Sequence, residues 1–324
     1  MLARNPTRQK GSRGVNLETV ATGLKFPEGP IWMPDGSVLV TEIVGGAVQR
    51  CWPDGRKTLL ATTGEGPNGA AIGPDGALYV CNSGGMAYTE VPSRGWILPG
   101  EQPDYYKGGS IQRIDMKTGE VRKIYTECDG VMLKGPNDLV FDALGNFWFT
   151  DHGKARHRDR DRGAIYYASA DGSFIREVII PLDAPNGIAL SPDGRRLYVA
   201  ESFTARVWAW DVIGPGVLQL NPRGRVHGGD LMIGLGGYHL LDSMAVDREG
   251  NVCVATLGDK CGITVIAPDK SRHTHITLPG PMPTNICFGG DKLERAWATL
   301  SPQGQLVTWL WSPTESPALP PVAA

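Results

Sequence analysis

No apolar run in the 324-residue sequence approaches the roughly 18 residues that a membrane-spanning helix needs. Residues 1–14 are polar and basic, and they lack the apolar stretch of a secretory signal. Charge of one sign is also missing, because 32 Lys and Arg residues nearly balance 34 Asp and Glu residues. This balance excludes a strongly basic nucleic-acid-binding protein. From the missing apolar run and the missing secretory signal, we expect a cytoplasmic protein that does not enter a membrane.

Cysteine is sparse, with six residues, and none has the C-x-x-C spacing that would suggest a zinc site or a disulfide framework. Gly236 and Gly237 lack the strand-to-helix context of a dinucleotide-binding loop, so no nucleotide cofactor is predicted. Ser243 and Ser301 lack the context of a nucleophile elbow, which disfavours a serine hydrolase. Glycine, with 43 residues, and proline, with 25, are abundant, as is typical of many short strands joined by tight turns.

One pattern recurs six times along the chain: an oxygen-bearing residue, a short apolar run, a turn and a β-rich run. Four copies turn on Asp-Gly or Gly-Asn, which is a strong signal for a β-hairpin. The oxygen-bearing residues, which we call the anchors, are Glu28, Asn68, Asn137, Asn186, Asp242 and Asn285.

A second hairpin is predicted between consecutive anchors, for example at 47–60, 110–126 and 164–180. Two hairpins make a four-stranded sheet, and six such sheets make an all-β, six-bladed β-propeller. Only one clear strand, 305–311, follows the last anchor, so we expect residues 17–22 to supply the missing outer strand and close the ring. The prediction is a single propeller domain over 15–312, with loose termini at 1–14 and 313–324.

The longest insertion, residues 83–109, carries Tyr88, Trp96, Tyr105 and Tyr106 without the alternation of a strand. A long aromatic segment in a compact domain is either a lid or binding loop, or an Ω-loop that packs on itself. Both interpretations stay open, and Trp96 and Tyr105 are candidate substrate-binding residues.

Each anchor precedes the innermost strand of its blade, so the six side chains should meet near one end of the central channel. They bring two carboxylates and four amides into a narrow space, and none is His or Cys. Hard oxygen donors in this number suit Ca²⁺, whereas zinc or copper would favour His or Cys. The alternative is that Asn before Gly only caps a turn, which accounts for Asn68 and Asn186 but not for Glu28 or Asp242.

Six segments in a fixed order span most of the chain: 26–30 (FPEGP), 135–138 (GPND), 149–151 (FTD), 184–187 (APNG), 242–247 (DSMAVD) and 284–290 (TNICFGG). Together they resemble the SMP-30/gluconolactonase/luciferin-regenerating-enzyme family. The resemblance implies a six-bladed propeller that holds a divalent metal in its channel, usually Ca²⁺, with Zn²⁺, Mn²⁺ or Mg²⁺ as other possibilities. It places metal ligands at Glu28, Asn186 and Asp242, and Asn137 matches a fourth ligand of organophosphatase-like members.

A Ca²⁺ with open positions is a Lewis acid that polarises a carbonyl or phosphoryl oxygen. The resemblance assigns the general base or nucleophile to Asp242. Asn68 and Asn137 could orient a sugar-like substrate or, alternatively, support the metal ligands. His152 stands where the family often has Pro, directly after a predicted strand, and is the rival catalytic residue.

These features predict a metal-dependent hydrolase that opens a small lactone or ester. The alternatives are a phosphotriesterase-like hydrolase on the same site, a propeller that serves only as a binding platform, and, more remotely, a strictosidine-synthase-like lyase. Two further groups are interpreted as structural. The charge-rich segment 154–162 is expected to be a solvated loop with self-pairing charges, and Asp151 and Glu201 are expected to be solvated rim carboxylates.

Overall fold

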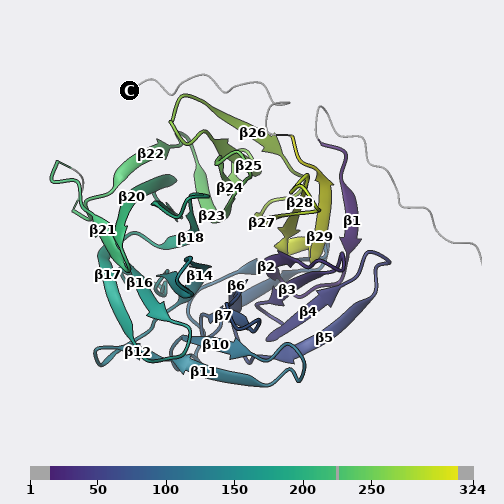
Figure 1. Ribbon diagram of the computed structural model, residues 1–324. Helices are drawn as coiled ribbons and strands as arrows, with labels where there is room; N and C mark the ends of the chain where they lie inside the picture. The colour runs from purple at the N-terminus through teal and green to yellow at the C-terminus, as the bar shows by residue number, and fades with distance from the viewer. Residues whose placement is uncertain (1–14, 224–225, 313–324) are drawn as a thin grey trace, which may run out of the picture.

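The structure is a computed structural model that describes residues 15–223 and 226–312, and it consists of six antiparallel blades arranged around an axis (Figure 1). The first strand of each blade lies innermost, and the chain moves outward through the blade before it enters the next one. The six-bladed, all-β propeller predicted from the repeat is therefore confirmed.

Blades 1 to 3 are regular four-stranded sheets. Blade 1 contains β2 (Pro27–Trp32), β3 (Val38–Glu42), β4 (Ala47–Cys51) and β5 (Lys57–Thr62). Blade 2 contains β6 (Pro67–Ile72), β7 (Leu78–Asn82), β10 (Ser110–Ile114) and β11 (Val121–Tyr125). Blade 3 contains β14 (Pro136–Phe141), β15 (Asn146–Asp151), β16 (Gly163–Ser169) and β17 (Ile175–Leu182), and a short hairpin of β12 (Glu127–Cys128) and β13 (Val131–Met132) precedes it.

Blades 4 and 6 vary this plan at their outer strands, whereas blade 5 is again a regular four-stranded sheet. Blade 4 contains β18 (Pro185–Leu190), β19 (Arg196–Glu201) and β20 (Arg206–Gly214), and two short strands, β21 (Val217–Gln219) and β22 (Asp230–Gly234), both pair with β20. Blade 5 contains β23 (His239–Val246), β24 (Val252–Gly258), β25 (Gly262–Ile266) and β26 (His273–Thr277). Blade 6 contains β27 (Pro283–Gly289), β28 (Arg295–Leu300) and β29 (Gln305–Leu310), with the short 3₁₀ helix η1 (Ser301–Gln303) before β29.

The fourth strand of blade 6 comes from the other end of the chain. β1 (Glu18–Ala21) runs antiparallel to β29, with Thr19 opposite Val307. Figure 1 shows this closure as purple β1 beside yellow β29. The predicted N-terminal closing strand is therefore confirmed, whereas the termini predicted to be loose, 1–14 and 313–324, lie outside the described residues.

The hydrophobic core lies between neighbouring blades and not on the axis. Tyr79 of β7 and Phe147 of β15, for example, join blades 2 and 3 with ring centroids 6.0 Å apart. Because apolar side chains fill the faces between the blades, the axial space is left to the inner strands and the groups that they present. None of the described residues forms a helix long and apolar enough to cross a membrane.

The 83–109 insertion contains a hairpin that the sequence analysis did not predict. β8 (Tyr88–Val91) pairs with β9 (Trp96–Pro99) around a turn in which Gly95 has a φ of 63°. The expectation that this segment has no strand is therefore wrong. Four residues per strand are too few to show a clear period of two, and the glycine turn is the only strong local signal.

Candidate functional site

The inner strands leave regular pairing at the anchors. In blade 1 the register between β2 and β3 shifts between Glu28 and Ile31, and the inner strands of the other five blades shift at the equivalent place. A β-bulge of this kind re-aims a side chain away from the face of its sheet. The repeated bulge therefore gives the anchors a common direction that a flat strand would not provide.

Glycines that follow two of the anchors allow adjacent inner strands to approach closely. A Cβ on Gly69 would lie 2.2 Å from Asp138 Oδ1, and a Cβ on Gly187 would lie 2.5 Å from Met244 N. Both glycines lie inside strands, β6 and β18, so their preceding asparagines do not cap turns. The turn-cap alternative is therefore wrong at both positions, since close packing around the axis explains these glycines.

The structure brings anchors from different blades together. Asn285 Nδ2 donates a 2.7 Å hydrogen bond to Glu28 Oε2, and Gly29 N donates to the same oxygen at 2.8 Å. On the other side, Ser243 Oγ donates to Asn186 Oδ1 at 3.3 Å, directly beside Asp242. Glu28 is only 2% exposed, while Asp242 keeps partial exposure.

Three carboxyl groups influence one another at this point. Burial raises the pKa of Glu28, and the hydrogen bond from Asn285 opposes this only in part. Burial, with the nearby Glu28 charge, raises the pKa of Asp242 and of Asp138 well above the ordinary value. Sequence reasoning missed Asp138 because in a regular strand the residue after the anchor Asn137 would point to the opposite face. The bulge after Pro136, which the sequence does not show, makes room for two consecutive polar residues.

The oxygen donors fit a hard cation. Asn137 Oδ1 is buried without a hydrogen-bond partner, so this oxygen has an unused lone pair. With Glu28, Asn186 and Asp242 it offers carboxylate and amide oxygens, the donors that Ca²⁺ prefers. Across 15–223 and 226–312, no group of three or more His, Cys, Asp or Glu side chains is placed to hold a metal ion. Any cation here would therefore depend on the two amides as well as on the two acids.

A cavity of 290 Å³ lies among the inner strands. Its lining includes the apolar residues Leu139, Ile188 and Met244 and the polar residues Asp138 and Asn285. Asp138 therefore lines this cavity, and its carboxyl group also interacts with the charge of Glu28.

Acidic residues at the ends of the second strands support the segments that enter the anchors. Asp151 accepts hydrogen bonds from Lys134 N and Gly135 N, both at 2.7 Å, and Glu201 accepts one from Asp183 N at 2.8 Å. Each acid lies opposite the proline that begins an inner strand. Because proline has no N–H to donate, the carboxylate binds the N–H groups just before it.

These contacts correct one expectation. Asp151 and Glu201 are each only 4% exposed, so they are not solvated rim groups. A Thr-Asp or Ala-Glu pair ending a second strand, opposite a Pro-Asn pair, is the sequence signal that could have identified them.

His152 follows β15 and lies near the adjacent blade. Its ring is in edge contact with Phe203, with centroids 5.8 Å apart, and burial lowers its pKa to about 4. The imidazole is therefore neutral at neutral pH. Its assignment as a rival catalytic residue stays a prediction.

The three other candidate substrate-binding residues have different surroundings. Asn68 is the second residue of β6, and its carbonyl accepts a 2.7 Å hydrogen bond from Thr41 Oγ1. Tyr105 is half exposed in the insertion, and Trp96, in β9, lies under the guanidinium of Arg94 at 4.7 Å. Their proposed contacts with a substrate stay predictions.

The charge-rich segment 154–162 differs in part from the expectation. Arg156 pairs with Asp159 and Asp161, so the charges do pair within the segment. Lys154, however, is only 8% exposed, so the segment is not simply a solvated loop.

Comparisons with known proteins agree with this architecture. Residues 26–301 match the family model described as the SMP-30/Gluconolactonase/LRE-like region. The chain is 28% identical to a gluconolactonase from Zymomonas mobilis, over 84% of this chain and 76% of that protein. It is 33% identical to the diisopropyl-fluorophosphatase of Loligo vulgaris over 56% of each chain. A gluconolactonase structure from Xanthomonas campestris superposes with a TM-score of 0.70 at 23% identity, covering 95% of both chains. The chain therefore belongs to the SMP-30/gluconolactonase/LRE-like family.

Proposed function

We propose that this protein is a metal-dependent hydrolase that opens small lactones, with Ca²⁺ as the preferred ion. The observation that carries the proposal is the closeness of the Glu28 and Asp242 carboxyl groups, whose charges interact, together with a buried Asn137 oxygen that has no hydrogen-bond partner. Relatives named gluconolactonase and lactonase support the choice of a lactone as substrate.

In this proposal Glu28, Asn137, Asn186 and Asp242 hold the ion. When bound, the ion supplies Lewis-acid polarisation of the lactone carbonyl. Asp242 accepts a proton from the attacking water while the water oxygen bonds to the carbonyl carbon. Asp242 then gives this proton to the ring oxygen as the C–O bond of the ring breaks. Asn68, Tyr105 and Trp96 bind the remainder of the substrate, and Asn137 combines this role with ligation.

A phosphotriesterase-like activity on the same residues is the second candidate. The similarity to the diisopropyl-fluorophosphatase of Loligo vulgaris favours it. A phosphoryl oxygen would then take the place of the lactone carbonyl, with the same four ligands and the same acidic residue beside the reacting centre.

The test is a panel of aldonolactones, simple lactones and a fluorophosphate, followed with a pH indicator. Each substrate is assayed with native protein, with EDTA-treated protein, and after separate addition of Ca²⁺, Mn²⁺, Mg²⁺ or Zn²⁺. We expect lactone opening that EDTA abolishes and Ca²⁺ restores. Hydrolysis of only the fluorophosphate would favour the second candidate, and no hydrolysis by protein shown to contain metal would favour a binding platform.

A further inference from the structure

The 83–109 insertion reaches two blades that lie on opposite sides of the ring. It connects β7 to β10, at the end of the propeller where second strands finish and inner strands begin. Near its C-terminal end, Gly109 N donates a 2.8 Å hydrogen bond to Leu133 O, just before blade 3. Its hairpin strand β9 lies beside η1 of blade 6. Since blades 3 and 6 face each other in a ring of six, the insertion spans the channel mouth.

Both attachments are next to anchors. Ser301 Oγ, at the start of η1, donates a hydrogen bond to Pro27 O, which precedes Glu28. On the blade 3 side, Tyr106 Oη of the insertion donates a 2.5 Å hydrogen bond to Lys134 O, three residues before Asn137. The insertion therefore lies over the inner ends of the blades and not along their outer edges.

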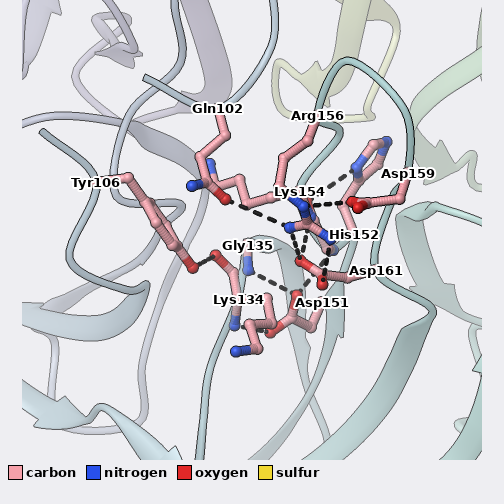
Figure 2. Close-up of polar contacts among 11 residues, drawn as sticks. Gln102, Tyr106, Lys134, Gly135, Asp151, His152, Lys154, Arg156, Asp159 and Asp161 are labelled. Carbon is pink, nitrogen blue, oxygen red and sulfur yellow. Dashed lines mark hydrogen bonds and ion pairs between the residues drawn. The ribbon is translucent and has the colours of Figure 1, made fainter. Parts of the chain in front are cut away.

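Figure 2 shows the polar network that joins the insertion to the 152–162 loop of blade 3. Gln102 N donates to Ala155 O at 2.9 Å, and Arg156 Nη1 donates to Gln102 Oε1 at 3.4 Å. The same Arg156 binds both oxygens of Asp161, at 3.0 and 3.1 Å. Asp161 in turn accepts a 3.0 Å hydrogen bond from Lys154 N, which continues the network beneath the insertion.

Lys154 is the buried centre of this network. Its Nζ donates a 2.6 Å hydrogen bond to Gly85 O at the start of the insertion and lies 5.1 Å from the centre of the Tyr106 ring near its end. Asp151 and Asp161 lie close enough to stabilise its charge, although burial lowers the pKa of Lys154 to about 8. A buried ammonium needs several such partners, so Lys154, Gly85 and Tyr106 are held in fixed positions relative to one another.

We propose that residues 83–109 form a fixed strut from blade 3 across the channel mouth to blade 6. Lys154 is the positioning residue that holds the beginning and the end of this segment, at Gly85 and Tyr106, on blade 3. The proposal rests on the proposed lactone hydrolysis for its consequence: compact single-ring lactones pass beside the strut, and lactones with long acyl substituents are excluded. Lys154 acts through Gly85 and Tyr106 and does not touch the substrate.

Hydrogen exchange of the full-length protein, followed by mass spectrometry, tests the strut without reference to activity. Lys154→Met keeps the length of the side chain but removes its charge and its donor. We expect exchange in peptides from 83–109 to accelerate by about tenfold, with the blades unchanged. The matched control is Lys107→Met, the same change at an exposed lysine of the insertion, which should leave exchange unchanged. Equal exchange in the two variants would overturn the proposal.

Kinetics then test the consequence. In Lys154→Met we expect KM for an aldonolactone to rise with kcat unchanged, and the ratio of kcat/KM for a long-chain acyl lactone over the aldonolactone to rise by about tenfold. An unchanged ratio alongside faster exchange would overturn the specificity role. If the parent protein opens no lactone, the proposed function fails, while exchange still decides the strut. Should Lys154→Met not fold, Tyr106→Phe, which removes the bond to Lys134 O, must also accelerate exchange in 83–109, or the strut is wrong.

Discussion

The anchors and the 83–109 insertion meet at the same end of the propeller, but they are held there in different ways. The anchors depend on a plan that each blade repeats: a β-bulge at the start of the inner strand and, in blades 1, 3 and 4, an acid opposite the leading proline. The insertion depends on single contacts made once, such as those of Lys154. Repeated backbone geometry thus positions the anchors, while individual side chains position residues 83–109 over them.

This difference has an energetic consequence. A substitution at or beside an anchor alters inner strands that pack against each other around the axis, so it should affect both stability and ion binding. A change in the insertion should open one segment and leave the ring intact. Substitutions in the two regions should therefore have separable effects on stability, ion binding and hydrogen exchange.

Replacing Asp242 with Asn should reduce lactone hydrolysis by about 10²–10⁴-fold even at saturating Ca²⁺, because a lost general base cannot be replaced by excess metal. The measurement is kcat at increasing Ca²⁺ concentrations. Glu28→Gln is the control for ligation alone, and we expect much of its activity to return at high Ca²⁺. Recovery of Asp242→Asn to the same extent would reduce Asp242 to a metal ligand.

Replacing Gly69 with Ala should lower the free energy of unfolding by about 3 kcal/mol, because the added methyl meets Asp138 Cα at 2.6 Å and Asn137 O at 2.7 Å. Neither backbone atom can move without displacing an anchor. Urea denaturation measures the effect. Gly214→Ala is the matched control, since its nearest neighbour is a side-chain atom at 3.8 Å, and equal stability losses would show that the inner strands are not tightly packed.

Replacing Asp151 with Asn should cost about 2 kcal/mol of stability, because one of its charge-assisted acceptors becomes an amide donor facing a backbone N–H. Asp151 binds the segment that carries both Lys134 and the entry to Asn137. We therefore expect weaker Ca²⁺ binding as well as faster exchange in 83–109, measured by calorimetry and hydrogen exchange. A change in only one of these would show that the two regions are not coupled through Asp151.

His152 gives the smallest expected effect. Its pKa is about 4 in the folded protein against an ordinary 6.5, so between these values the unfolded chain binds a proton that the native state does not. This histidine therefore lowers the free energy of unfolding as the pH falls from 6.5 towards 4. Between pH 6.5 and 5.5 we expect His152→Gln to reduce that decline by about 1 kcal/mol, and to retain hydrolysis within about tenfold.

The matched control for His152 is His275→Gln, since burial also lowers the pKa of His275 to about 4. It should flatten the pH dependence of stability in the same way and leave activity unchanged. Loss of activity in His152→Gln alone, with normal Ca²⁺ binding, would move the general-base role from Asp242 to His152.

Much of the fold could be predicted from the sequence because the same strand-turn-strand pattern recurs six times. Asp-Gly and Gly-Asn turns located the hairpins, and the single strand after Asn285 indicated that the N-terminal strand closes the ring. The convergence of Glu28 with Asn285 followed from the same topology. These predictions succeeded because they depend on local turn chemistry and on counting strands.

The remainder of the site depends on geometry that has no local sequence signal. The bulge that lets Asp138 join Glu28 and Asp242 arises only when β14 pairs with β15. Lys154 looked like one charge among many in a polar run, and its burial arises from Gly85 and Tyr106, which lie far away in the sequence. The β8–β9 hairpin was missed because its strands are so short.

Ring closure also makes the candidate site a late product of folding. The hydrogen bond from Asn285 to Glu28 joins residues 257 positions apart, and β1 cannot pair until β29 exists. During synthesis, Glu28 is therefore made long before its partner. Blade 6 is completed only when β1, near the start of the described chain, pairs with β29, near its end. Such distant pairing slows folding and exposes strand edges in the meantime. Ion binding at Glu28 would consequently report that the ring has closed, so a partly made chain would have no competent site.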